Sequence, residues 1–126
     1  QQHELATNLA MALERCVFQE NDSLIKQGSA ASGVYFLTSG EVEISVEVDG
    51  EVKRVPFKGA KFVGEKSLLN RTRAEASVKA VSPVECYLLG ESDYNHLVDR
   101  FPVLKAWMKQ AASVRTLADY TGTLEK

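Results

Sequence analysis

The segment from Glu41 to Val48 constrains the fold of this chain more than any other. Its side chains alternate strictly, with Val42, Ile44, Val46 and Val48 on one face and Glu41, Glu43, Ser45 and Glu47 on the other. A period of two residues is that of a β-strand with one buried face. The dipeptide Asp49-Gly50 follows, which favours a two-residue hairpin turn. The sequence therefore predicts a strand over 41–48 and an antiparallel return over 51–55, which Pro56 ends because proline has no N–H to donate.

Further short strands are expected on both sides of this hairpin. Residues 16–18, 23–26, 34–38, 74–80 and 84–89 are apolar or alternate between apolar and polar, and turn-forming residues separate them. Together with the hairpin they amount to about eight short strands. Many short strands joined by glycine-rich turns are typical of a β-roll or a sandwich.

Helical patterns flank the strands. Residues 4–14 carry apolar side chains at helical spacing, and a second helix is expected to begin at Ser92 or Asp93 and to end at Phe101-Pro102. A last helix, reaching residue 118, is predicted by the spacing of Leu104, Trp107, Met108, Ala111, Val114 and Leu117. We therefore expect one domain over 1–126, with an N-terminal helix, a roll over 16–89 and C-terminal helices over 92–118.

Composition limits the classes of function. The 126 residues are 44% hydrophobic and 25% charged, and the net charge of -2 gives no overall field that would attract nucleic acid. No apolar run approaches the ~20 residues needed to cross a bilayer, and no signal peptide is recognisable, so direct membrane insertion is not expected. Cys16 and Cys86 stand in apolar stretches, which predicts buried, reduced thiols and a cytoplasmic location. The Gln-Gln-His start suggests a piece of a larger protein.

The sequence offers no set of residues for catalysis or for metal binding. His3 and His96 lie on predicted helices far apart in the chain, with no second ligand at metal spacing. No Ser-His-Asp, Cys-His or paired-carboxylate arrangement is present, so an enzyme is not expected. No basic recognition helix follows the strands, which disfavours a DNA-binding protein. Neither a cofactor nor a metal is predicted.

One stretch between the strands carries a recognisable pattern. It reads Gly64-Glu65, a short helical run ending in Leu68-Leu69, a brief turn, and then Arg73-Ala74-Glu75-Ala76-Ser77-Val78-Lys79-Ala80. This resembles the phosphate-binding cassette of cyclic-nucleotide-binding domains, and Gly33 to Val42 resembles the strand and turn that precede the hairpin in that family. The resemblance covers residues 4–115 and is strongest to the cytosolic domain of hyperpolarisation-activated and cyclic-nucleotide-gated channels.

The resemblance implies a mainly β fold with flanking helices. It is an eight-stranded β-roll, or jelly roll, of cyclic-nucleotide-binding type, with an N-terminal helix, a short cassette helix and C-terminal helices. It also implies cAMP or cGMP as the candidate ligand, held by the cassette over 62–78. The candidate pocket residues are Phe62, Val63, Gly64, Glu65, Ser67, Leu68, Arg73, Ala74, Glu75, Ala76 and Ser77.

In the family, a glutamate at the position of Glu65 accepts a hydrogen bond from the ribose, and a backbone amide and hydroxyl at the positions of Ala76 and Ser77 complete the phosphate cradle. Glu65 is equally well explained as an acid in the first turn of a helix, where it favours the helix dipole. Ser77 is better explained as an ordinary strand residue. The pattern alone leaves these alternatives open.

The arginine that pairs with the phosphate in the family is displaced here. A gapless alignment puts Ala74 at its position and Glu75 beside it, while Arg73 stands one residue early. A shift of one residue turns a side chain to the other face of a strand. Arg73 could still serve if the turn over 70–72 were rearranged, and Lys66 could supply a positive charge, although Lys66 also fits a solvated surface position.

These departures predict a regulatory module without catalytic activity, whose phosphate site is degenerate and which binds cAMP or cGMP weakly or not at all. It would act through a protein partner or the remainder of a larger parent protein, in the cytosol or at the cytosolic face of a membrane protein. Two alternatives remain open. One is a genuine cAMP or cGMP sensor that uses Arg73 or Lys66, and the other is a pocket for a nucleoside or for a residue of the chain's own C-terminus, such as Tyr120.

Overall fold

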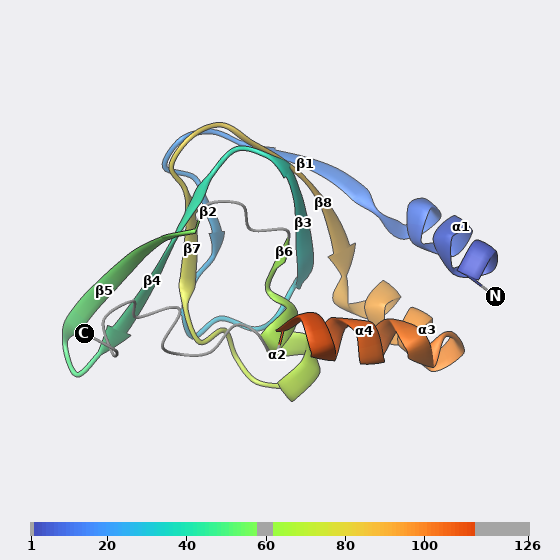
Figure 1. Cartoon of the computed structure of the whole chain (residues 1–126). Helices are drawn as coiled ribbons and strands as arrows, with labels where there is room; N and C mark the ends of the chain where they lie inside the picture. The colour runs from blue at the N-terminus through green and yellow to red at the C-terminus, as the bar shows by residue number, and fades with distance from the viewer. Residues whose placement is uncertain (1, 58–61, 113–126) are drawn as a thin grey trace.

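The computed structural model describes residues 2–57 and 62–112, and within them eight strands form two four-stranded antiparallel sheets that make a β-roll (Figure 1). The strand orders are β1-β8-β3-β6 and β2-β7-β4-β5. This is the mainly β fold that the sequence predicted. The strands are β1 (Glu14–Phe18), β2 (Ser23–Ile25), β3 (Gly33–Ser39), β4 (Val42–Val48), β5 (Glu51–Phe57), β6 (Phe62–Val63), β7 (Ser77–Ala80) and β8 (Val84–Gly90).

The predicted hairpin is present as β4 and β5. Its turn residues Asp49 and Gly50 have φ values of 54° and 83°, the left-handed values that a tight hairpin turn requires. Val42, Ile44 and Val46 are buried as expected, but Val48 is 49% exposed. The alternation therefore predicted the buried face of the strand correctly. It could not predict that the tip of the hairpin extends past the opposite sheet, which leaves Val48 exposed (Figure 1).

Pro56 does not end the returning strand. β5 continues to Phe57, and Pro56 stands opposite Glu43 in the ladder. The prediction that the strand would stop at Val55 was wrong because β5 lies at the edge of its sheet. An edge strand has one side without a neighbouring strand, so a residue without an N–H is tolerated there.

The strand predicted over 74–80 is shorter, since β7 begins at Ser77. The backbone of Ala74 pairs instead with the loop that follows β2. The Ala74 N–H donates to the Ser29 carbonyl at 2.9 Å, and the Gly28 N–H donates to the Ala74 carbonyl at 2.8 Å. Both backbone groups of Ala74 are thus satisfied outside the sheet, and the segment before β7 is tied to this loop.

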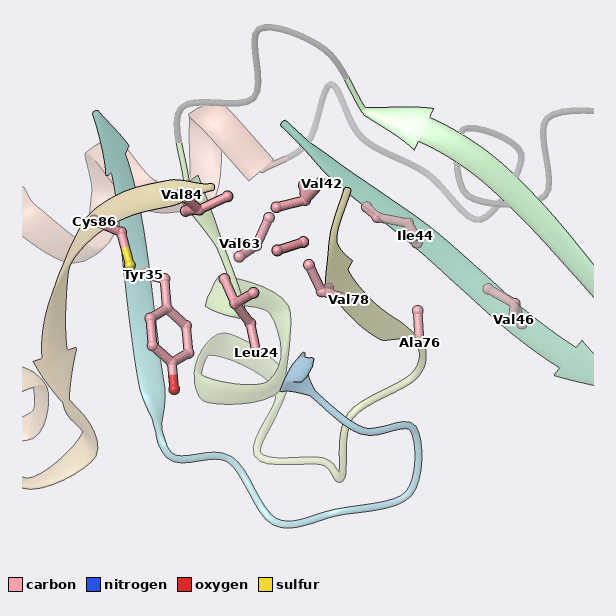
Figure 2. Close-up of a cluster of buried hydrophobic side chains, with 11 residues drawn as sticks. Leu24, Tyr35, Val42, Ile44, Val46, Val63, Ala76, Val78, Val84 and Cys86 are labelled. Atoms are coloured by element: carbon pink, nitrogen blue, oxygen red, sulfur yellow. The ribbon is translucent and has the colours of Figure 1, made fainter. Parts of the chain in front are cut away.

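The interior of the roll is a continuous apolar core. Figure 2 shows side chains of the two sheets converging, among them Leu24, Tyr35, Ile44, Val63 and Val78. Cys16 and Cys86 stand opposite each other on β1 and β8, and both are free thiols. Burial, with a smaller contribution from Cys16, raises the pKa of Cys86 to about 11. Cys86 is fully buried and Cys16 half-buried, in agreement with the predicted reduced thiols.

Four helices occur in the described residues, and they lie at one end of the roll (Figure 1). They are α1 (Gln2–Ala12), α2 (Glu65–Asn70), α3 (Glu91–Arg100) and α4 (Pro102–Ala112). The first helix ends two residues before the predicted boundary because Glu14 already belongs to β1. α3 begins after Gly90, with no side-chain cap, so the predicted start at Ser92 or Asp93 was wrong. Val114, Leu117 and Tyr120 lie outside the described residues.

A second apolar cluster joins these helices to the roll. Val34 and Leu89 contribute from the sheet, Leu68 from α2, Tyr94 from α3, and Met108 from α4. Met108 is completely buried, whereas Val103 on the same helix is 59% exposed. α4 therefore depends on this cluster for its position, and the cluster connects α4 to α2.

Replacing Met108 by alanine should lower the free energy of unfolding by about 2–5 kcal/mol, because it removes a fully buried side chain and leaves a cavity. The matched change Val103→Ala on the exposed face of the same helix should cost less than ~1 kcal/mol. Urea unfolding followed by circular dichroism measures both. Equal losses for the two variants would contradict the assignment of the buried face.

Candidate functional site

The site is organised by α2, which follows β6 directly. Gly64 is the residue before the helix and has φ of 95°, and a Cβ built on it would stand 2.7 Å from the carbonyl oxygen of Gly33. Both the backbone angle and the close approach require glycine. At the other end, Arg71 also adopts a left-handed conformation, and its N–H donates to the carbonyl of Ser67. The helix is therefore confined to six residues.

A small hollow opens between α2, the β2 end and the segment before β7. We call it the roll hollow. Its volume is about 40 Å³, far below the ~300 Å³ at which ligand pockets usually begin. Most of its wall is apolar, and the bulky side chains at its inner side belong to the core drawn in Figure 2. Its lining residues are Ile25, Ile44, Val63, Gly64, Lys66, Ser67, Ala74, Glu75, Ala76 and Val78.

The structure thus brings six of the candidate residues together in the roll hollow: Val63, Gly64, Ser67, Ala74, Glu75 and Ala76. Ala74 is buried at 9% exposure and contributes a methyl group. Glu75 is exposed and Lys66 half-buried, so the charged groups of the wall are one carboxylate and one ammonium. The wall of this hollow contains no guanidinium.

Arg73 is not part of the roll hollow. Its guanidinium Nη1 donates to the carbonyl of Gly28 at 3.2 Å, and the side chain is exposed. It lines a different, larger hollow, together with Arg71. The backbone bonds of Ala74 described above hold this arrangement in place.

Four other candidate residues point elsewhere. Phe62 and Leu68 pack in the second apolar cluster, and the ring centroid of Phe62 stands 5.8 Å from that of Trp107. The side chain of Glu65 is completely buried and is not part of the wall of the roll hollow. The hydroxyl of Ser77 accepts a hydrogen bond from the Gln27 N–H at 2.9 Å.

Sequence reasoning did not include Ile25, Ile44 and Val78 among the pocket residues. They stand opposite one another in the sheet, since Val78 is in register with both Ile25 and Ile44. Strand alternation predicts that Ile44 and Val78 face inward. The sequence does not show which strands are neighbours, however, so alternation alone could not bring these side chains to the same hollow.

No metal-binding cluster of His, Cys, Asp or Glu occurs in residues 2–57 and 62–112. His3 on α1 and His96 on α3 are both exposed. Over the same ranges, every helix is too short or too polar to traverse a lipid bilayer.

Trp107 is 52% exposed and its ring contacts that of Phe62, and Met108 beside it is buried. These two residues therefore serve the packing of α4.

Comparison with known proteins gives a consistent result. The sequence profile described as "Cyclic nucleotide-binding domain" matches residues 15–101, which is most of the chain. Among curated proteins, the potassium/sodium hyperpolarization-activated cyclic nucleotide-gated channel 2 of Mus musculus is 29% identical over 89 residues, which are 71% of this chain and 10% of the channel. The chain therefore spans only a small part of this relative.

Two solved structures are informative. A regulatory subunit of a cAMP-independent protein kinase A from Trypanosoma brucei is 26% identical with a TM-score of 0.72, and the match covers 82% of this chain and 38% of that one. That protein is a mutant with three substitutions, glutamate to alanine, threonine to arginine and valine to alanine, bound to cAMP in its A site. The corresponding Trypanosoma cruzi subunit, bound to guanosine, is 27% identical with a TM-score of 0.71, covering 83% and 37%.

The geometry at Gly64 yields a test. Gly64→Ala should destabilise the fold more than Gly50→Ala, because both glycines have left-handed φ values of 95° and 83°, but only at Gly64 would the new methyl group meet backbone. The backbone conformation alone should cost about 1–2 kcal/mol in each variant. Urea unfolding of the two variants measures the difference. A Gly64→Ala loss no larger than that of Gly50→Ala would show that the contact with Gly33 is unimportant.

Proposed function

Since the chain belongs to the cyclic nucleotide-binding domain family, we propose that it is a non-catalytic regulatory module of that family whose phosphate site is degenerate. It binds cAMP and cGMP weakly or not at all, and it acts through protein contacts and conformational coupling within a larger parent protein in the cytosol or at the cytosolic face of a membrane channel. Residues 62–78 remain the candidate ligand site.

One observation carries this proposal: Ala74, which the gapless alignment puts at the position of the phosphate-binding arginine, contributes only a buried methyl group to the roll hollow. Arg73, the nearest alternative, donates to the Gly28 carbonyl and faces another hollow. Bringing its guanidinium into the roll hollow would require the backbone bonds of Ala74 to Gly28 and Ser29 to break. Loss of one charged hydrogen bond to a phosphate costs about 1.5–3 kcal/mol, or one to two powers of ten in affinity.

The charges of the wall add to this effect. Glu75 places a carboxylate at the roll hollow, and two like charges about 4 Å apart repel by roughly 4 kcal/mol at an effective dielectric constant of 20. Solvent reduces that figure because Glu75 is exposed. Lys66 contributes an ammonium, which offsets the carboxylate without adding a net positive charge. The small volume of the hollow also works against a nucleotide in this conformation.

Signals would pass from the cassette to the C-terminal helix. Leu68 of α2 and Met108 of α4 belong to the same apolar cluster, and Phe62 before the cassette contacts Trp107. A displacement of α2 therefore changes the packing of α4. The exposed side chains Val103 and Trp107 give α4 a surface on which a neighbouring part of the parent protein could respond.

Isothermal titration calorimetry with cAMP and cGMP tests the proposal. The unmodified chain should give no saturable heat, which corresponds to a dissociation constant above about 1 mM. The double variant Ala74→Arg, Glu75→Ala should bind cAMP at least ten- to a hundredfold more tightly, because it restores a charged donor and removes the carboxylate. The T. brucei mutant bound to cAMP also gained an arginine and lost a glutamate, which supports this design.

The control variant Ala74→Met, Glu75→Ala adds a side chain of similar length without charge. It should show no gain, because methionine cannot donate to a phosphate. Saturable binding of cAMP to the unmodified chain at low micromolar concentration would refute the degenerate site. In that case Lys66→Ala and Arg73→Ala would identify which cation had replaced the arginine.

A nucleoside is the second candidate ligand. The roll hollow is lined mostly by apolar side chains, which suit an uncharged ring better than a phosphate, and the similar T. cruzi subunit is bound to guanosine. A nucleoside, like a nucleotide, would have to widen the hollow beyond its volume of about 40 Å³. Native mass spectrometry of protein purified without added ligand should then reveal a retained nucleoside. A mass equal to that of the bare chain, together with no calorimetric response to guanosine, would exclude this candidate. Tyr120, proposed as an internal occupant, lies outside the described residues.

A further inference from the structure

Arg71 and Arg73 are the cations of the cassette that the proposed function leaves unused. Both line one hollow of about 380 Å³, which we call the outer hollow, between the turn after α2, the loop before β3 and the start of α3. This volume lies within the range of ordinary small-molecule sites, about 300–1,000 Å³. The outer hollow shares only Ser67 with the roll hollow, so it is a separate place in the fold.

The two arginines are not neutralised by the rest of the described chain. Within residues 2–57 and 62–112, no acidic side chain forms an ion pair with Arg71 or Arg73, and one N–H of Arg73 is used by the Gly28 carbonyl. By contrast, Arg15 and Arg54 pair with Glu85 and Glu43. Two guanidinium groups at one concave surface attract an anion, and arginine matches the geometry of phosphate oxygens.

Other polar side chains of the outer hollow are equally available. The hydroxyls of Ser67 and Thr72 and the amide of Asn95 make no side-chain hydrogen bond within the described part of the chain. Ser67 is nine-tenths buried and lines both hollows. Hydroxyl and amide groups can donate to phosphate oxygens or bond to the hydroxyls of a ligand.

Glu91, at the start of α3, brings a carboxylate to the same hollow. A second phosphate beside it would be repelled, whereas a hydroxyl could donate to it. The arrangement therefore has a cationic part and a part suited to hydroxyl groups. We propose that the outer hollow binds a phosphorylated sugar, with the phosphate between Arg71 and Arg73 and the sugar hydroxyls toward Glu91 and Asn95.

The backbone at this place is fixed by contacts already described. Arg71 is held in a left-handed conformation at the end of α2, the Thr72 N–H donates to the Ser67 carbonyl at 3.1 Å, and the Glu91 N–H donates to the Ser32 carbonyl at 3.1 Å. A ligand that bridges the turn to α3 would draw these elements together. It would thereby act on α2, and through the second apolar cluster on α4, without entering the roll hollow.

Amide chemical shifts of the unmodified, isotope-labelled chain, titrated with ribose 5-phosphate, test this inference. We expect saturable shifts at Arg71, Thr72, Arg73 and Asn95, with inorganic phosphate binding more weakly at the same amides and ribose without phosphate giving no shift. Arg71→Ala should weaken the binding at least tenfold. The control Arg54→Ala removes an exposed arginine of β5 that does not line this hollow, and it should leave the affinity unchanged.

The absence of saturable shifts, or equal affinity in the unmodified chain and Arg71→Ala, would overturn the inference. Equal affinity for inorganic phosphate and ribose 5-phosphate would overturn the role of Glu91 and Asn95 and thus the sugar. Shifts at Ile44, Ala76 and Val78 instead would place the ligand in the roll hollow. The inference is distinguishable from the proposed function, because Arg71 lines only the outer hollow: binding that persists in Arg71→Ala belongs to the roll hollow, and binding that this variant loses belongs to the outer hollow.

Discussion

The structure of the candidate site depends on the two backbone hydrogen bonds that join Ala74 to the loop at Gly28 and Ser29. They fix which side chain of the segment enters the roll hollow, and they leave Arg73 on the other side, where its guanidinium meets the carbonyl of Gly28. A shift of one residue would break both of these bonds, and the backbone of a neighbouring residue would have to pair with the loop in place of Ala74. The loop and the cassette therefore hold each other in the arrangement that separates Arg73 from the roll hollow.

The fold does not depend on ligand chemistry at this site. The core of the roll is formed by apolar side chains from both sheets, and the second cluster fixes the helices at one end (Figures 1 and 2). Burial of these side chains supplies the free energy of folding, and none of it requires an arginine at position 74. The packing between α2 and α4 therefore does not require a phosphate contact, and a displacement of α2 can be transmitted through it. Regulation by protein contacts, and a ligand at the outer hollow, are both compatible with this scaffold.

Much of the fold could be predicted from local patterns. The alternation over 41–48 and the turn at Asp49-Gly50 were sufficient for the hairpin, because both depend on residues close in sequence. The errors at Val48 and Pro56 arose because exposure and tolerance of proline depend on where a strand lies in its sheet.

The site was likewise predictable only where it depends on residues close in sequence. The sequence predicted a cassette with a displaced arginine. The direction of Arg73 depends on the loop at Gly28, the burial of Glu65 depends on packing around α2, and the inclusion of Ile25 depends on its register with Val78.

Equilibrium dialysis of the unmodified chain against radiolabelled cAMP and cGMP tests the central claim most directly, namely that the roll hollow lacks the means to hold a cyclic phosphate. With protein in excess of the nucleotide, our account predicts equal nucleotide concentrations on the two sides of the membrane. An excess on the protein side that unlabelled nucleotide displaces, and that persists in Arg71→Ala, would place a cyclic nucleotide in the roll hollow and contradict the account.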